Sequence, residues 1–198
     1  MKHISFFLFF IASLTTVVAQ EKPEGLFINS KAPEFKGTDQ SGVTVNLKDL
    51  RKKGPVVVLF YRGNWCPYGT KELKRFQDSL NLLTEKGASV VAITPEGAEG
   101  ISKTVEKAGA VFPILTDADM KIATSYQVAY VVDDRSLGRY KNAGIDLLQI
   151  NGQKQASLPV PAIYVINKEG SIKYRFFDED YKKSASVAEI LREMKGLF

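Results

Sequence analysis

The chain contains one cysteine, and the residues around it are of the types that activate a thiol. Cys66 follows Trp65 and precedes Pro67, and Arg62 stands four positions before it. The thiolate is the nucleophilic form of cysteine, and a nearby guanidinium or a helix N-terminus lowers the pKa of a thiol. Proline suits the first position of a helix, where no N–H donor is needed. This pattern favours a reactive thiol over the alternative of a buried, inert cysteine.

Two elements flank Cys66 and would hold it in place. Residues 56–61 form an unbroken apolar and aromatic run rich in valine, which predicts a strand buried on both faces. After the cysteine, apolar side chains recur at helical spacing, at Leu73, Phe76, Leu80 and Leu83. We therefore predict that Cys66 stands where a buried strand meets the N-terminus of a helix.

Strand and helix patterns alternate along the rest of the chain, which predicts an α/β sheet with parallel strands and right-handed crossovers. Strands are expected at 43–47, 88–94, 111–115 and 161–166, and after a turn at 167–170 an antiparallel partner at 171–177. Helices are expected at 97–108, 120–126 and 186–194. Residues 49–53, 133–135 and 139–141 are interpreted as exposed turn or loop, and 145–150 as a helix or a substrate-side insertion.

Residues 1–19 have the pattern of a secretory signal peptide. A basic start at Lys2 precedes an apolar stretch at 6–14, and Ala19 is a small residue suited to cleavage. The alternative is a membrane anchor, but the apolar stretch is short for a bilayer span. We expect cleavage after Ala19, no stable membrane span thereafter, and an exported domain at 20–198, either periplasmic or secreted.

Removal of this segment would leave a chain without histidine, because His3 is the only one. Ordinary Cys-His and Ser-His-Asp catalysis is thereby excluded, and so is a Cys/His zinc site. Neither common Gly-rich phosphate loop occurs, so we expect no metal and no cofactor. The 27 basic and 22 acidic residues are interspersed, which is typical of a solvated surface and not of a nucleic-acid interface.

The stretch Tyr-Arg-Gly-Asn-Trp-Cys-Pro-Tyr at 61–68 resembles the active-site stretch of peroxiredoxin-like proteins of the alkyl hydroperoxide reductase and thiol-specific antioxidant group. Five further segments resemble that family's opening, middle and late strand: 31–35, 42–47, 91–96, 112–117 and 158–166. The likeness extends over roughly residues 28–195. It implies a thioredoxin-like α/β fold, with a central mixed sheet and flanking helices.

The resemblance also implies an activity, that of a one-cysteine thiol peroxidase. The Cys66 thiolate would attack hydrogen peroxide or an organic hydroperoxide, and an external thiol or a thioredoxin-like protein would reduce the product. Arg62 would lower the pKa of the thiol and stabilise the developing negative charge. Pro161 and Trp65 would shape the substrate pocket, and Tyr68 is assigned to its lining. The Val160–Pro161 bond resembles the cis-proline bond of thioredoxin folds and is expected to be cis.

The chain departs from the family pattern in three ways. Many relatives have a second cysteine where this chain has Gly69, and Gly63 and Leu59 stand where the pattern has a hydroxyl residue and a proline. An arginine near the late strand is also absent at its usual place, which leaves Arg62 and Arg175 as substitutes. Two alternatives therefore stay open: a thiol–disulfide exchange protein acting through Cys66, and a thioredoxin-fold binding module without catalysis. Both a monomer and a homodimer are compatible with the sequence.

Overall fold

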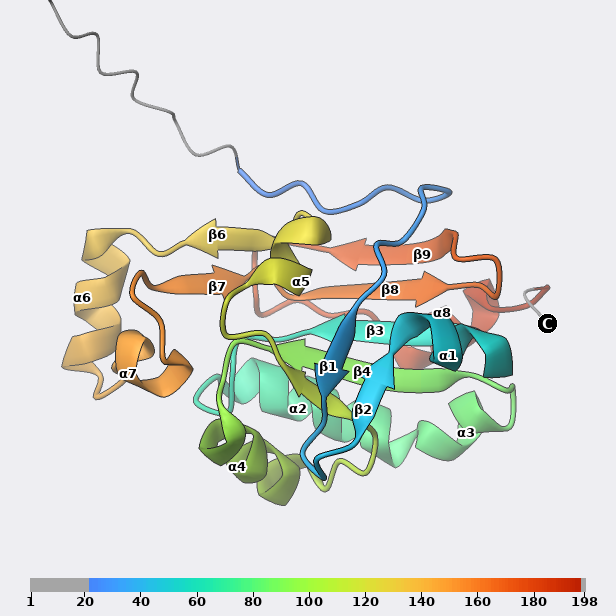
Figure 1. Ribbon diagram of the computed structural model, residues 1–198, viewed down its shortest axis with the longest axis horizontal. Coiled ribbons are helices and arrows are strands. Elements are labelled where there is room, and N and C mark those ends of the chain that lie inside the picture. The colour runs from blue at the N-terminus through green and yellow to red at the C-terminus, as the bar shows by residue number, and fades with distance from the viewer. Residues whose placement is uncertain (1–21, 197–198) are drawn as a thin grey trace, which may run out of the picture.

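A five-stranded mixed sheet forms the centre of the structure, a computed structural model that describes residues 22–196 (Figure 1). Its strand order is β5-β4-β3-β8-β9, where β3 pairs in parallel with β4 and antiparallel with β8. The strands are β3 (Val56–Phe60), β4 (Ser89–Thr94), β5 (Ile114–Thr116), β8 (Ala162–Ile166) and β9 (Ile172–Phe177). The strands predicted at 56–61, 88–94 and 161–166 and the β8–β9 hairpin are confirmed, whereas the strand predicted at 111–115 begins only at Ile114.

The central strand β3 is buried along its whole length, as its apolar run predicts. No residue from Val56 to Phe60 is more than 1% exposed. Val57 and Leu59 pack into a hydrophobic cluster on one face of the sheet, while Val58 and Phe60 pack into another on the opposite face. Apolar contacts on both faces hold β3 in place, so the chain that leaves its end is held in a defined position.

Helices cover both faces of the sheet. One face is covered by α2 (Pro67–Asp78), α3 (Leu80–Thr84), α4 (Ala98–Ala108) and α8 (Val187–Glu193). The other is covered by α1 (Leu47–Lys53), α5 (Lys121–Ser125) and the hairpin of β1 (Lys36–Thr38) and β2 (Thr44–Asn46). The continuous helix expected after Cys66 is interrupted at Ser79, whose φ of −107° and ψ of 9° end α2 and begin α3.

Three segments interpreted as turn or loop are mostly helical instead. The expected turn at 49–53 lies in α1, where the Asn46 side chain caps the helix by accepting a bond from the Asp49 N–H. The expected loops at 133–135 and 139–141 lie mostly in α6 (Asp134–Asn142), which Asp133 caps in the same way. These predictions were wrong because they were based on charge, whereas an Asn or Asp cap starts a helix even where few residues are apolar.

A small lobe, residues 129–159, extends beyond the end of the central sheet (Figure 1). It contains β6 (Ala129–Val131), α6, α7 (Leu147–Asn151) and β7 (Ser157–Pro159), with β6 and β7 paired antiparallel. Its own core is Val132, Leu147, Ala156 and Leu158, and Trp65 from the Cys66 loop packs against it. The lobe is therefore in direct contact with the segment that carries the thiol.

The predicted signal peptide at 1–19 lies outside the described residues, and the 20–198 domain boundary stays a prediction. Within residues 22–196, no helix is long and apolar enough to cross a membrane.

Candidate active site

Cys66 is the N-cap residue of α2, as the sequence predicts. Pro67 occupies the first helical position, and no side chain caps this helix end. The Cys66 N–H donates to the Gly63 carbonyl at 3.1 Å, and the Cys66 carbonyl accepts the first helical bond from Thr70 at 3.2 Å. Cys66 is 3% exposed. It therefore lies beside uncapped N–H groups and the positive end of the helix dipole, which stabilise a thiolate.

Arg62 contacts the thiol directly. Its Nη2 atom donates to Cys66 Sγ at 3.0 Å, and its Nη1 atom donates to the Tyr140 hydroxyl at 2.9 Å. Burial alone would lower the pKa of Arg62. The charge and hydrogen bond of Cys66, together with Tyr140 and Tyr130, outweigh burial, so the net shift of this pKa is upward. The guanidinium therefore stays charged beside the sulfur.

Aromatic rings enclose the Arg62 side chain. Its guanidinium carbon lies 3.7 Å from the centre of the Tyr181 ring and 5.2 Å from that of Trp65. Trp65 in turn packs edge-on against Tyr140, with 5.2 Å between ring centres. Arg62 is only 4% exposed as a result. The enclosure comes from the lobe and from the segment after β9, both distant in sequence.

Glu96 fixes the loop that carries Arg62 and Cys66, and the sequence did not point to it. Its carboxylate accepts from the Asn64 N–H at 2.8 Å and from Asn64 Nδ2 at 2.6 Å. Burial raises the pKa of Glu96. Lys107 holds the same loop by donating to the Asn64 carbonyl at 3.0 Å. The sequence does contain one signal for this role of Glu96: it is an acidic residue that comes just after a buried strand, at the end of the sheet where loops meet.

Gly63 leaves no room for the hydroxyl residue of the family pattern. Its φ is +146°, which disfavours any side chain, and an added Cβ would lie 2.6 Å from both Glu96 Oε1 and Trp65 Nε1. A hydroxyl residue therefore cannot simply replace Gly63, because Glu96 and Trp65 occupy the space that its side chain would need.

A cavity of about 490 Å³ opens beside Cys66. Tyr68 and Pro161, which the sequence assigns to a substrate pocket, line it together with Arg62. Trp65 does not line it but packs against the lobe behind Arg62. The sequence missed two further aromatic wall residues, Phe176 of β9 and Tyr181 after it, because a contact this distant in sequence leaves no local pattern.

The Val160–Pro161 bond is trans, so the cis prediction was wrong; none of the peptide bonds in residues 22–196 is cis. The Val160 N–H donates to the Val128 carbonyl at 2.8 Å in the extended connection between β7 and β8. This pairing is satisfied by the trans form, which is the lower-energy default for a bond before proline.

Arg175 is not brought to the cavity. It lies over Phe27 and Phe177, at 5.1 Å and 5.0 Å from their ring centres, and donates to the Glu24 carbonyl. Successive side chains of a strand point to opposite faces, so Arg175 and the cavity residue Phe176 face opposite sides of β9. Of the two arginine substitutes, only Arg62 is at the thiol.

The chain matches the sequence model of the AhpC/TSA family over residues 28–175. It belongs to the AhpC/TSA family. A "Putative peroxiredoxin" of Mycobacterium tuberculosis is 35% identical over 96 residues, which are 48% of this chain and 60% of that protein. The chain thus matches less than two thirds of that relative's length. "Putative peroxiredoxin bcp" of Helicobacter pylori is 29% identical over 162 residues, 82% of this chain and 95% of the relative.

A second kind of relative is the thiol-disulfide oxidoreductase ResA of Bacillus anthracis, 26% identical over 161 residues, 81% of this chain and 75% of ResA. Among solved structures, peroxidoxin BcpB from Mycobacterium tuberculosis has a TM-score of 0.68 at 22% identity and covers 86% of this chain and 97% of its own. A yeast mitochondrial 1-Cys peroxiredoxin has a TM-score of 0.65 at 20% identity, and the match covers 87% of this chain and 76% of that one. The expected thioredoxin-like fold is confirmed.

Proposed function

We propose that this protein is a one-cysteine thiol peroxidase. The Cys66 thiolate attacks one oxygen of a peroxide, the O–O bond breaks, and the second oxygen leaves as water or an alcohol after taking up a proton. Cys66 becomes a sulfenic acid. The observation that carries this proposal is the 3.0 Å contact of Arg62 Nη2 with Cys66 Sγ at an uncapped helix N-terminus. The peroxiredoxin-named relatives support it.

Arg62 has two roles in this proposal. Before the reaction its positive charge favours the thiolate over the thiol. During the reaction, negative charge develops on the leaving oxygen, and the same guanidinium is placed to stabilise it. Tyr68 and Pro161 would form walls of the substrate cavity, and Trp65 would support Arg62 by packing against it. With Gly63 in place of a hydroxyl residue, Arg62 and the backbone N–H groups of α2 are the donors that we assign to the peroxide.

Turnover needs a second thiol, and the chain has only one. The proposed reductant is therefore external, either a small thiol or a thioredoxin-like protein, and it passes through a mixed disulfide with Cys66. The yeast mitochondrial 1-Cys peroxiredoxin has a thiol resolving mechanism "via glutathione/thioredoxin systems", which supports an external route by analogy.

Intact-mass measurement tests the proposal. One equivalent of hydrogen peroxide should add one oxygen atom to the mature protein within seconds, at Cys66, and Cys66→Ser should take up none. Slow oxidation restricted to methionines would contradict the peroxidase and favour the non-catalytic binding module.

Thiol–disulfide exchange is the second candidate, favoured by the similarity to ResA. It would use the same thiol but act on protein disulfides. Capture of protein partners by Cys66 as mixed disulfides, together with inert behaviour toward peroxide, would favour this function instead.

We also propose that the protein is exported, on the basis of the signal-peptide pattern at 1–19. Sequencing the N-terminus of the protein recovered from fractionated cells tests this. Export with cleavage predicts a first residue of Gln20, whereas an intact N-terminus in the cytoplasmic fraction would contradict it.

A further inference from the structure

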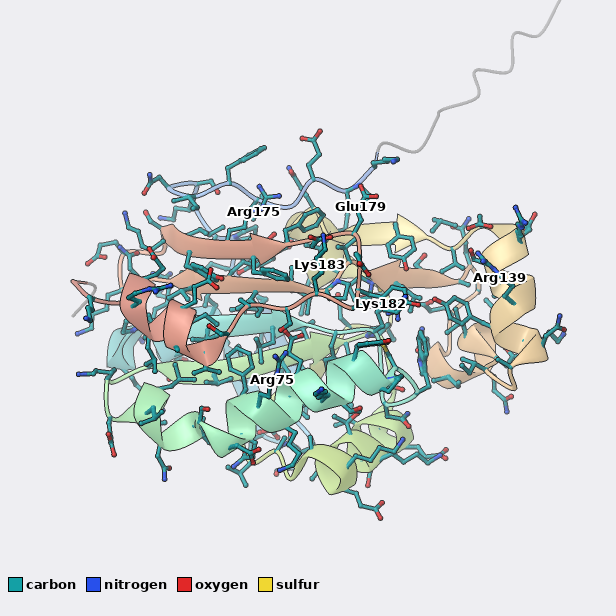
Figure 2. All side chains as sticks on the ribbon, turned by 180° about the vertical axis from the view of Figure 1, so that it is seen from behind. Arg75, Arg139, Arg175, Glu179, Lys182 and Lys183 are labelled. Carbon is teal, nitrogen blue, oxygen red and sulfur yellow. The ribbon has the colours of Figure 1, made fainter. Side chains whose placement is uncertain are left out.

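The cavity beside Cys66 is strongly basic. Its lining includes five basic side chains and a single acidic one, Glu72. The basic residues are Arg62, Lys71, Arg75, Lys182 and Lys183. Two of them stand one turn apart on α2, and Lys182 and Lys183 come from the segment after β9. Figure 2 shows Arg75 on the same face of the molecule as Lys182 and Lys183.

Acidic side chains of the described residues offset part of this charge, at Arg75, which acts on Glu72, and at Lys183. Glu72 is buried, its pKa is raised by that burial, and its carboxylate accepts a hydrogen bond from the Ser184 hydroxyl. Lys183 pairs with Asp178 at 2.9 Å. Within residues 22–196, neither Lys71 nor Lys182 forms an ion pair. The cavity therefore presents a positive field next to the thiol.

The size of the cavity fits a molecule larger than hydrogen peroxide. At about 490 Å³, it is in the range of small-molecule sites, roughly 300–1,000 Å³. Hydrogen peroxide is small and uncharged, so it requires neither this volume nor the lysines. The other reactant that the proposed function requires is a thiol, and Cys66 is reached through this cavity.

We infer that the cavity binds low-molecular-weight thiols bearing carboxylates, which are the reductants of oxidised Cys66, and that Lys71, Arg75 and Lys182 hold those carboxylates. This inference rests on the proposed peroxidase function. The thiol attacks the sulfenic sulfur, forms a mixed disulfide and releases water. A second thiolate then attacks the mixed disulfide and releases Cys66 as a thiolate and a small-molecule disulfide. Two thiols are oxidised and one sulfenic acid is reduced, so electrons balance.

A charge-graded set of thiols tests the inference on the mature chain. Mercaptoethanol has no carboxylate, mercaptopropionate has one and mercaptosuccinate has two. The test variant is Lys71→Gln/Lys182→Gln, and its matched control is Lys48→Gln/Lys86→Gln, which removes the same charge from exposed lysines outside the cavity. For each thiol, the rate of reduction of the Cys66 sulfenic acid is measured in the parent and in the variant. The ratio of these two rates does not depend on the intrinsic reactivity of the thiol.

The expected ratio for the test variant rises with carboxylate number, from about one for mercaptoethanol to about ten for mercaptosuccinate. The control ratio should stay near one for all three thiols, and added salt should shrink the difference. Equal ratios for all three thiols in the test variant would overturn the inference, even if Cys66 is oxidised as proposed.

Disulfide probes separate this inference from the peroxidase proposal. Cys66 should react with the dianionic dithiobis(nitrobenzoate) faster in the parent than in Lys71→Gln/Lys182→Gln, while neutral dithiodipyridine should show no difference. That result, combined with no reaction toward peroxide, would support anion recognition while overturning the peroxidase. A charge-independent response would overturn the anion site itself.

Discussion

At the scale of single residues, Arg62 connects the thiol to the small lobe. One nitrogen of its guanidinium bonds Cys66 Sγ and another bonds the Tyr140 hydroxyl, so the two contacts share one rigid plane. A residue of the lobe thereby orients the cation that acts on the sulfur, and the two contacts should not contribute independently.

Replacing Arg62 with methionine should slow oxidation of Cys66 by about 100-fold, the usual scale for losing one donor to a developing charge. The fold should persist, because methionine is apolar and can fill part of the enclosed site. Rapid-quench mass measurement of Cys66 oxidation, with circular dichroism for the fold, checks both. Arg175→Met is the matched control and should react at the parent's rate. An unchanged rate in Arg62→Met would leave the backbone N–H groups as the only activators.

Tyr140→Phe should slow the same step by about fivefold, the equivalent of a single hydrogen bond. Tyr140 is a positioning residue, so its effect should depend on the cation that it orients. In an Arg62→Met background, Tyr140→Phe should therefore have no further effect on the rate. An equal loss in both backgrounds would instead indicate a general structural role for Tyr140.

At the scale of elements, the strand–cysteine–helix unit was predictable, because a buried apolar run and a proline after the cysteine are local patterns. The walls of the site were not. Tyr181 and Glu96 come from segments that lie far from Cys66 along the chain. The caps Asn46 and Asp133 could have been recognised, since both residue types start helices.

Gly63→Thr would restore the hydroxyl of the family pattern, yet it should destabilise the protein. Positive φ and a Cβ only 2.6 Å from Glu96 and Trp65 atoms together predict a loss of about 3 kcal/mol in the free energy of unfolding. Urea denaturation measures this. Gly138→Ala is the control, because an added Cβ there meets no atom within 4 Å and its φ is not positive. Parent-like stability of Gly63→Thr would show that the loop adapts freely.

Asp117 should make stability depend on pH. It accepts from the Ile122 and Ala123 N–H groups of α5, and burial raises its pKa to about 6 from an ordinary 3.8. The carboxyl group of Asp117 therefore binds its proton more tightly in the folded state than in the unfolded state. The stabilisation is fully present below pH 3.8 and is lost as pH rises through 6, up to about 3 kcal/mol in total.

Asp117→Asn has no such titration. The difference in free energy of unfolding between the parent and Asp117→Asn should therefore fall as pH rises from 4 to 6, and denaturation at a series of pH values measures it. A difference that stays constant over this range would mean that Asp117 ionises in the folded state as it does in the unfolded chain.

At the scale of the whole molecule, turnover is determined by the presence of a single thiol, that of Cys66. Without added thiol, excess peroxide should give one fast oxidation of Cys66 and then the sulfinic acid, which ordinary thiols do not reverse. Thiol supplied with the peroxide should sustain turnover, and the same thiol added late should not restore activity. Peroxide consumption and intact mass follow these outcomes. Sustained turnover with no thiol present would rule the mechanism out.

Trp65 is the only tryptophan of the chain, and it lies 5.2 Å from the guanidinium that bonds the reacting sulfur. Each redox step of Cys66 changes the charge on that sulfur and hence the electric field across the indole ring. Intrinsic fluorescence therefore has one dominant source placed beside the chemistry. The fluorescence of Trp65 can thus follow the successive states of Cys66 in real time, without a dye or a label.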